Sequence, residues 1–401
     1  MEKEKIITSF GLMPKEEMLE VKPNFKQLQI GMPKESSFQE NRVSLTPESV
    51  ALLVANGHRI VIEKGAGVAS SFTDGQYADR GAEIVYSKKE VFKANLILKI
   101  EPPTKSELDM MQRGQVLISA VQMSTQSKDY FETLIKKKVS AFGFEFIRDN
   151  QGKLPIVRSM SEIAGNTSLL IAGEYLSNVN KGKGLMLGGI SGLMPTNVVI
   201  IGAGTVGEYA CRTSLGLGAS VIVFDNSVSK LRRLQDNIHQ RVSTSWFQPK
   251  VLIKALKRAD VVISALQVSD GKVPCIVSED MVMEMKKGAV VIDVSIDQGG
   301  SFETSELTDH KDPTFIKHNV VHYCVPNIAS RVSRTASIVI SNILTPILLN
   351  IAEEGGVENT IRRHEFLRNG VYVFNGSVTN EILSKNFKLP FKDLGLIMSA
   401  L

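Results

Sequence analysis

A glycine-rich turn in the middle of the chain constrains the fold more than any other feature. Residues 198–207 read VVIIGAGTVG, and the helix-forming run EYACRTSLGLG follows them. Gly202 permits a tight turn after the strand, Gly204 lets backbone N–H groups approach a pyrophosphate, and Gly207 lets the helix pack on the strand. The positive end of the helix would face the diphosphate. This strand–turn–helix unit predicts a dinucleotide-binding site.

An acidic residue after the next strand indicates which dinucleotide binds. Asp225 closes the apolar run SVIVFD, 23 residues after Gly202. Its carboxylate can accept hydrogen bonds from both ribose hydroxyls and would repel a 2′-phosphate, so we expect NAD rather than NADP. Thr205 and Val206, at the start of the helix, are expected to contact the coenzyme. The alternative interpretation is a glycine-rich turn that binds no ligand.

The composition is that of a soluble globular protein. The chain has 401 residues, of which 43% are hydrophobic and 22% charged, enough for two or three domains with sizeable cores. The net charge of +5 is spread along the chain and there is a single Trp, which does not indicate a nucleic-acid partner. Cys211, Cys275 and Cys324 lie far apart, which favours a reducing cytoplasm and predicts neither disulfides nor a metal site.

No segment predicts insertion into a membrane. Residues 1–26 are charged and lack the apolar core of a signal peptide, so we interpret them as an N-terminal extension. The longest apolar stretch, residues 335–354, reads TASIVISNILTPILLNIAEE and contains several polar side chains. A membrane span needs about 20 predominantly apolar residues. This stretch is therefore expected to be a buried helix between two domains.

Strand-like and helix-like segments alternate along the chain. A first series of strands is expected at residues 28–34, 58–67, 95–100, 114–121 and 139–147. Helices are expected between them at residues 46–57, 87–94, 104–112 and 127–138, and another at residues 161–180. A second series of strands is expected at residues 198–202, 220–225, 260–266, 289–295 and 320–325. This alternation predicts parallel sheets that helices cover on both faces.

The order of these segments predicts an α/β protein with two doubly wound parallel-sheet domains. The NAD-binding Rossmann domain (159–339) is expected to be inserted in a discontinuous substrate domain, formed by residues 27–158 and 340–401. Residues 357–401 are expected to add helices beside the substrate domain. Ligands of such sheets bind beyond the carboxyl ends of the strands and between domains.

Polar residues at the expected strand ends are the candidates for a substrate site. They include Arg42, Lys99, Gln122, Asp297 and Asn327. An arginine and a lysine that face a dinucleotide suggest a small anionic substrate, since a guanidinium binds a carboxylate through two hydrogen bonds. An aspartate beside them could transfer a proton or hold an amine. Arg42 and Lys99 could also be ordinary surface charges, and Lys34 and Glu35 are interpreted as a solvated pair.

The motifs that contain these residues resemble those of a known family. From about Leu28 to Leu401 the chain resembles the alanine dehydrogenase / nicotinamide nucleotide transhydrogenase α-subunit family. The pieces that carry the resemblance are IGMPKES…ENRVSLTP, NLILKIEPP, RSMSEIAG, VVIIGAGTVG, VIDVSIDQGG and HYCVPN. They occur in the family's order over more than nine tenths of the chain. Because of IDQGG and a short connection after Asp225, the chain looks closest to the alanine dehydrogenases.

The resemblance implies roles for individual residues. Arg42 and Lys99 would hold the carboxylate or keto oxygen of a small 2-oxo or amino acid. Met160 and Ser161 would line the nicotinamide pocket, where Asn327 would also lie. Asp297 would be a catalytic acid or base, and Asp225 would bind the adenosine ribose with Lys230 nearby. The implied reaction is the reversible NAD-dependent oxidation of L-alanine to pyruvate and ammonia, by a homo-oligomer that is a hexamer or a dimer.

The chain departs from the alanine dehydrogenases at the position of a catalytic histidine, where it has Gln122. Glutamine can hydrogen-bond a carbonyl but cannot store a proton near neutral pH. Proton transfers would then depend on Asp297, helped by Lys99 if its pKa is lowered. Arg158 and Arg331 resemble arginines of the transhydrogenase branch. Two alternatives therefore stay open, which are hydride transfer like that of a transhydrogenase α-subunit with a partner chain, and a non-catalytic NAD(H)-binding sensor.

Overall fold

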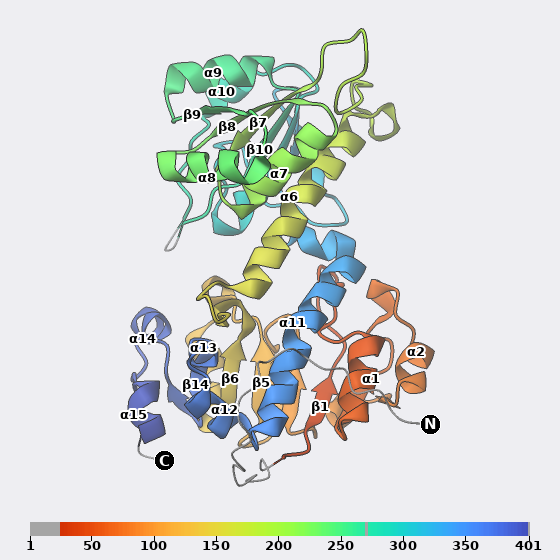
Figure 1. Ribbon diagram of the computed structural model, residues 1–401, viewed down its shortest axis with the longest axis vertical. Coiled ribbons are helices and arrows are strands. Elements are labelled where there is room, and N and C mark those ends of the chain that lie inside the picture. Colours follow the sequence, from red (N-terminus) through yellow and green to blue (C-terminus); the bar gives the residue numbers. More distant parts are fainter. Residues whose placement is uncertain (1–24, 269–271, 400–401) are drawn as a thin grey trace, which may run out of the picture.

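The computed structural model describes residues 25–268 and 272–399 and contains two large β-sheets (Figure 1). The N-terminal extension expected at residues 1–26 lies outside the described residues except for its last two positions. The first sheet has the strand order β15-β14-β6-β5-β4-β1-β2-β3. Its strands are β1 (Gln29–Met32), β2 (Arg59–Glu63), β3 (Glu83–Val85), β4 (Leu96–Leu98), β5 (Val116–Ser119), β6 (Ser140–Gly143), β14 (Val371–Phe374) and β15 (Ser377–Val378).

The second sheet has the order β12-β13-β11-β10-β7-β8-β9. Its strands are β7 (Asn197–Ile201), β8 (Ser220–Phe224), β9 (Ser243–Ser245), β10 (Val261–Ser264), β11 (Val290–Asp293), β12 (Thr314–Lys317) and β13 (Val320–Tyr323). All strands of both expected series form, and they are parallel within each sheet. Their apolar side chains belong to cores on both faces of each sheet, as expected for strands between two helical layers.

Helices cover both sheets. Those of the first lobe are α1 (Pro47–Ala55), α2 (Asp74–Asp79), α3 (Lys88–Val91), α4 (Lys105–Met110), α5 (Lys128–Lys136), α12 (Val357–Arg363), α13 (Glu365–Arg368), α14 (Glu381–Phe387) and α15 (Leu394–Ser399). Those of the second lobe are α7 (Thr205–Gly216), α8 (Val228–Ile238), α9 (Pro249–Arg258) and α10 (Glu279–Met283). The two lobes are thus two doubly wound α/β units.

The expectation that residues 357–401 are helices is wrong for one hairpin. Val371–Phe374 forms β14, all four residues of which are buried, and this strand pairs antiparallel with β6. Asn375 and Gly376 have φ values of 43° and 76° and connect β14 to β15, because a two-residue hairpin turn needs positive φ at both positions. The second sheet also has one antiparallel edge strand, β12. Neither sheet is therefore purely parallel.

Two long helices, α6 (Pro155–Leu176) and α11 (Ser333–Glu353), run between the lobes (Figure 1). In the described part of the chain, only the helical stretch 328–353 has the length and mean hydropathy, 1.7, of a membrane span. Half of that span is buried inside the protein, and Ile340, Leu344 and Leu348 belong to the core of the first lobe. This packing is typical of a core helix. The domain boundaries that we propose, at 158/159 and 339/340, fall within these two helices.

Candidate active site

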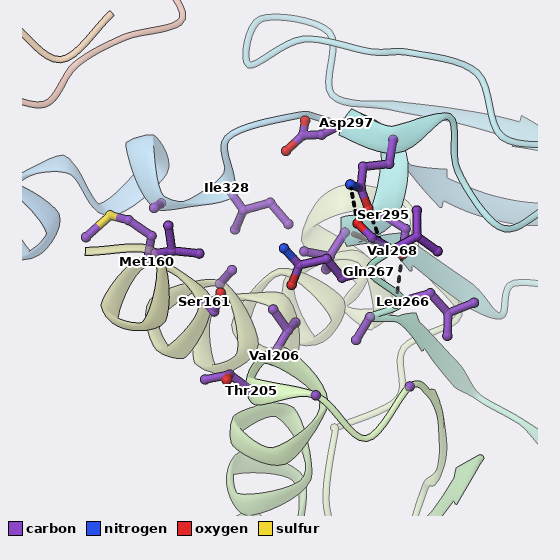
Figure 2. Close-up of a pocket in the computed structure, with 18 of the residues that line it drawn as sticks. Met160, Ser161, Thr205, Val206, Leu266, Gln267, Val268, Ser295, Asp297 and Ile328 are labelled. Atoms are coloured by element: carbon purple, nitrogen blue, oxygen red, sulfur yellow. Dashed lines mark hydrogen bonds between the residues drawn. The ribbon is translucent and has the colours of Figure 1, made fainter. Parts of the chain in front are cut away.

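A cavity of about 740 Å³ lies at the carboxyl ends of the strands of the second sheet, and residues of both lobes line it. Figure 2 shows Met160 and Ser161 of α6, Val206 of α7 and Asp297 around the same space. Most of the residues proposed from the sequence line this cavity, namely Arg42, Met160, Ser161, Gly202, Gly204, Thr205, Val206, Asp225, Lys230, Asp297 and Asn327. Gly207, Lys99 and Gln122 do not line it.

The three glycines of the turn have different surroundings. Gly202 has a φ of 110°, and a Cβ there would lie 2.5 Å from the carbonyl oxygen of Ala265. A Cβ on Gly207 would lie only 1.9 Å from the carbonyl oxygen of Gly202. At Gly204 no protein atom lies within 4 Å of the Cβ position. Packing therefore requires glycine at Gly202 and Gly207, whereas Gly204 leaves open space for a ligand to approach the backbone.

Asp225 organises this turn from the end of β8. Its carboxylate accepts hydrogen bonds from the backbone N–H of Ala203, at 2.7 Å, and of Ser227, at 2.8 Å. Only 3% of the residue is exposed. A carboxylate has about four lone-pair sites, so acceptor positions remain for the hydroxyl groups of a ribose. The helix α7 begins beside it with Gly204 as N-cap and no side-chain cap, which leaves N–H groups of its first turn available to an anion.

Arg42 lies at the other end of the cavity, in an ion pair that the sequence analysis missed. Its Nε and Nη2 donate to the two carboxylate oxygens of Glu40, at 2.7 and 2.6 Å. The Glu40 side chain is fully buried, and that of Arg42 is 11% exposed. Burial lowers the pKa of Arg42, but the charge and hydrogen bonds of Glu40, together with the charges of Glu35 and Glu101, raise that pKa above its ordinary value. Arg42 is thus a fixed cation in the cavity wall and not an ordinary surface charge.

Lys99 is buried next to the cavity lining, between two carboxylates. Its Nζ is 2.9 Å from Glu35 Oε2 and 3.4 Å from Glu107 Oε1, and its side chain is 1% exposed. Burial lowers the pKa of Lys99, but the Glu35 and Glu107 charges raise it above its ordinary value. The expectation of a lowered pKa is therefore wrong. So is the interpretation of Glu35 as half of a solvated pair with Lys34, since only 7% of its side chain is exposed.

Gln122, which the sequence resemblance aligns with a catalytic histidine, has a left-handed backbone with a φ of 46° and is exposed. The half-buried Glu145 holds its backbone, because Glu145 Oε1 accepts the N–H of Val121 at 2.7 Å and that of Gln122 at 3.2 Å. Glu145 lines the cavity, and among the described residues its Oε2 has no hydrogen-bond partner. Burial raises the pKa of this carboxyl. Glu145 is a second acidic residue of the site that the sequence analysis missed.

Asp297 lies in the short 3₁₀ segment η5 (Val294–Gln298) that follows β11. Asp297 is an exposed residue that lines the cavity, where neighbouring protein atoms partly desolvate its carboxyl. This desolvation raises the pKa of Asp297 to about 6, against the opposing charge of Arg42, and Asp293 adds to the rise. A carboxyl with a pKa near 6 can both accept and return a proton close to neutral pH. Asp297 thus has the properties expected of an acid/base group.

The carboxyl of Glu101, which with Lys99 is one of the polar residues that follow β4, is another acidic group near the site. Burial and the charges of Glu40 and Glu35 raise its pKa to about 7. By contrast, Arg158 and Arg331, which suggested the transhydrogenase branch, form ion pairs with Glu162 and Glu174 and do not line the cavity. Both of their carboxylate partners belong to helix α6.

One lobe holds a dinucleotide cradle with the Asp297 carboxyl beside the same cavity, and the other lobe adds the Arg42 cation to that cavity. This arrangement defines the class of protein, a two-lobed NAD-dependent oxidoreductase. Two family models match the chain, "Alanine dehydrogenase/PNT, N-terminal domain" over residues 31–164 and "Alanine dehydrogenase/PNT, C-terminal domain" over residues 168–381. The chain belongs to the alanine dehydrogenase/PNT family.

Individual relatives agree with this assignment. The chain is 38% identical to alanine dehydrogenase from Methanococcus maripaludis, over 90% of this chain and 97% of that protein. It is 37% identical to alanine dehydrogenase 2 from Staphylococcus aureus, over 92% and 98%. A solved L-alanine dehydrogenase superposes with a TM-score of 0.84 at 33% identity, over 90% of this chain and 99% of that one. A transhydrogenase from Sinorhizobium meliloti, at 21% identity and a TM-score of 0.75, shares the fold.

Proposed function

We propose that this chain catalyses the reversible reaction of L-alanine, NAD⁺ and water to pyruvate, ammonium, NADH and a proton. The observation that carries the proposal is that one cavity is lined both by Arg42 and Asp297 and by the glycine turn and Asp225. Curated relatives named alanine dehydrogenase, matched over nearly their whole length, support the same reaction. Neither a transhydrogenase role nor a non-catalytic sensor is favoured by any feature of the cavity.

Different residues would bind the substrate and the coenzyme. Bound NAD supplies the hydride acceptor, and the turn residues, Asp225 and Lys230 would hold it. Arg42 would bind the carboxylate of alanine or pyruvate through Nη1 and the second N–H of Nη2, since Nε and the other N–H of Nη2 donate to Glu40. Once the Cα hydride has left, water adds to the imine carbon and ammonia departs. Asp297 would take a proton from this water and return one to the leaving nitrogen.

Lys99 and Gln122 keep their predicted roles only as hypotheses. Lys99 would polarise the substrate oxygen through the third hydrogen of its Nζ, since Glu35 and Glu107 accept the other two. This requires its buried side chain to reach the cavity, which it does not line. Gln122 would hydrogen-bond the substrate from a loop whose backbone Glu145 holds. Met160 and Ser161 of α6 and Asn327 would line the nicotinamide pocket.

The direct test is NADH formation from alanine and NAD⁺ at alkaline pH, together with NADH consumption by pyruvate and ammonium. We expect turnover in both directions, and Gln122→His is expected to raise kcat, since a positioned acid/base group typically contributes about 10²–10⁴-fold. Gln126→His, on the exposed loop beyond it, is the matched control and should leave kcat unchanged. An enzyme inactive in both directions that nevertheless binds NADH would reject the proposed reaction.

We also propose that the chain forms a homo-oligomer through the second lobe. Large apolar side chains are exposed around α6 and the loop that follows it, where a groove of about 490 Å³ lies. They are Leu170, Val179, Met186, Ile190, Leu193 and Met194, with Val179 and Met194 nearly 90% exposed, at 88% and 87%. Leu170 and Met186 line this groove together, and large apolar patches on soluble proteins often mark interfaces with other proteins. A second copy of the chain would cover it, in a dimer or a hexamer.

Light scattering after size-exclusion chromatography tests this interface. Replacing Ile190 and Met194 together with aspartate is expected to shift the mass to that of a monomer, because two buried charges would oppose association. Leu307→Asp changes an equally exposed leucine elsewhere in the lobe and should not alter the mass. A monomeric parent protein, or a double variant that keeps the parent's mass, would contradict the proposed interface.

We further assign the chain to the cytoplasm. All three cysteines are free, and Cys211 and Cys324 are buried without forming a disulfide. Free thiols are typical of proteins from reducing compartments. The assignment predicts full activity in the presence of a thiol reductant.

A further inference from the structure

The carboxylate of Glu40 contacts both lobes of the cavity. Besides its two bonds to the Arg42 guanidinium, its Oε1 accepts the backbone N–H of Arg42 at 2.9 Å. Its Oε2 accepts a hydrogen from Nδ2 of Asn327, also at 2.9 Å. Arg42 belongs to the first lobe, and Asn327 follows β13 of the second lobe. One fully buried side chain therefore joins the residue that faces the substrate to a residue of the nicotinamide pocket.

This carboxylate determines which groups of its two partners remain for ligands. An ionised carboxylate only accepts hydrogen bonds, so only the NH₂ group of the Asn327 amide can face it. The carbonyl oxygen of Asn327 is then left as an acceptor for an N–H donor in the cavity. On the other side, Nε and one N–H of Nη2 of Arg42 are engaged, which leaves the second N–H of Nη2 and those of Nη1, which is 3.4 Å from Sδ of Met160, for a carboxylate.

The neighbouring backbone strengthens the same junction. The N–H of Asn41 donates to Oγ of Ser330 at 2.9 Å, and this hydroxyl donates to the carbonyl oxygen of Gln39 at 2.7 Å. Residues 39–42 of the first lobe are thus held against residues 327–330 of the second. Asn327 itself has a left-handed backbone with a φ of 57°, a conformation that asparagine tolerates better than most residues. The junction is a defined structure and not an incidental contact.

We propose that Glu40 is a positioning residue that couples the binding of coenzyme to the binding of the substrate carboxylate. The inference rests on the proposed function for the identity of the two ligands. A coenzyme that binds Asn327 holds Glu40 and Arg42 in place, so a carboxylate that binds second loses less conformational freedom. By reciprocity, the bound carboxylate raises the affinity for the coenzyme by the same factor. Glu40 would thus act through Arg42 and Asn327 without touching either ligand.

Titration of NADH fluorescence, with and without saturating oxamate, tests the coupling. Oxamate is an analogue of pyruvate in which an amino group replaces the methyl group, and it is not reduced. In the parent protein, oxamate is expected to tighten NADH binding by at least about fivefold, within the usual range of coupling between sites. In Glu40→Gln, the factor by which oxamate tightens NADH binding should fall to between one and two. The KM for pyruvate should also rise by a larger factor than that by which kcat falls. The glutamine NH₂ cannot accept from Arg42 or from the Asn327 NH₂ group.

Two further variants make the result decisive. Glu354→Gln removes a carboxylate that pairs with Arg363 at the far end of α11, and it should keep the parent coupling factor. Ser330→Ala removes two bonds of the junction but no charge, so it tests the proposal even if Glu40→Gln does not fold. Like Glu40→Gln, this variant should reduce the factor by which oxamate tightens NADH binding. A Glu40→Gln or Ser330→Ala protein with the parent factor, or a parent protein without coupling, would overturn the inference.

These measurements do not need turnover. A parent protein in which NADH and oxamate bind cooperatively, but which does not oxidise alanine, would reject the proposed reaction and support the role of Glu40. The converse result, turnover of alanine with no loss of coupling in Glu40→Gln, would reject only the role of Glu40.

Discussion

Asp297→Asn is expected to lower kcat for alanine oxidation by about 10²–10⁴-fold, the usual contribution of a positioned acid/base group. Asparagine keeps the shape of the side chain but cannot take a proton from the attacking water. NADH affinity is expected to change by a few-fold at most, since the glycine turn and Asp225 are unaffected. Stopped-flow measurement of NADH formation gives kcat, and fluorescence titration gives the affinity.

The pH dependence provides a second readout of the same variant. Burial raises the pKa of Asp297 to about 6, so the carboxylate needed as a base is lost as the pH falls through 6. In the parent protein, kcat/KM for alanine should decline below that pH, and in Asp297→Asn this limb should disappear. Asp236→Asn on the exposed side of α8 serves as control and should keep both rate and profile. A normal rate or an unchanged limb in Asp297→Asn would show that another group transfers the proton.

Alanine substitutions at three glycines are expected to separate coenzyme binding from folding. Gly207→Ala places a Cβ 1.9 Å from the carbonyl oxygen of Gly202, a backbone atom that cannot move aside. We expect a loss of about 1–3 kcal/mol in the free energy of unfolding, or more, and loss of measurable NADH binding. Gly204→Ala meets no protein atom, so the protein should unfold like the parent and yet bind NADH more weakly.

Gly216→Ala is the matched control in the same helix. No atom lies within 4 Å of its Cβ position, and alanine favours a helix over glycine by roughly 0.5–1 kcal/mol. This variant should therefore be at least as stable as the parent, with unchanged NADH affinity. Denaturant unfolding and NADH titration of the three proteins check the set. Normal NADH binding by Gly207→Ala, or by Gly204→Ala, would show that the turn does not hold the coenzyme.

The sequence was sufficient to predict five strands of each sheet, because parallel strands that are buried on both faces appear as unbroken apolar runs. It did not predict the edge strands β3, β9, β12 and β15. It did not lead to β14, which is only four residues long and lies among helices. The Asn375–Gly376 pair that follows β14 is a known hairpin signal and could have revealed it. Antiparallel pairing of β14 with β6 depends on tertiary packing, which no local pattern of residues specifies.

At the site, the residues that follow strand ends were predictable because the topology brings those ends together. The partners of these residues were not predictable. Glu40 and Asn327 are separated by 287 positions in the chain, and Lys99 and Glu35 by 64. Folding buries the charged group of each pair, and a buried charge needs a hydrogen-bonding or ionic partner. The partner is therefore set by the tertiary structure and not by the local sequence. For the same reason the raised pKa of Lys99 could not be inferred from its place after β4.

The helix α6 contributes to two cores at once. Ile156 near its start packs in the core of the first lobe, whereas Leu169, Ile171 and Leu176 pack in that of the second. Separating the lobes would leave one of these apolar surfaces in water. Heating should therefore melt the molecule in one cooperative transition, and a gene fragment that encodes only the inserted module would need a redesigned α6 surface to remain soluble.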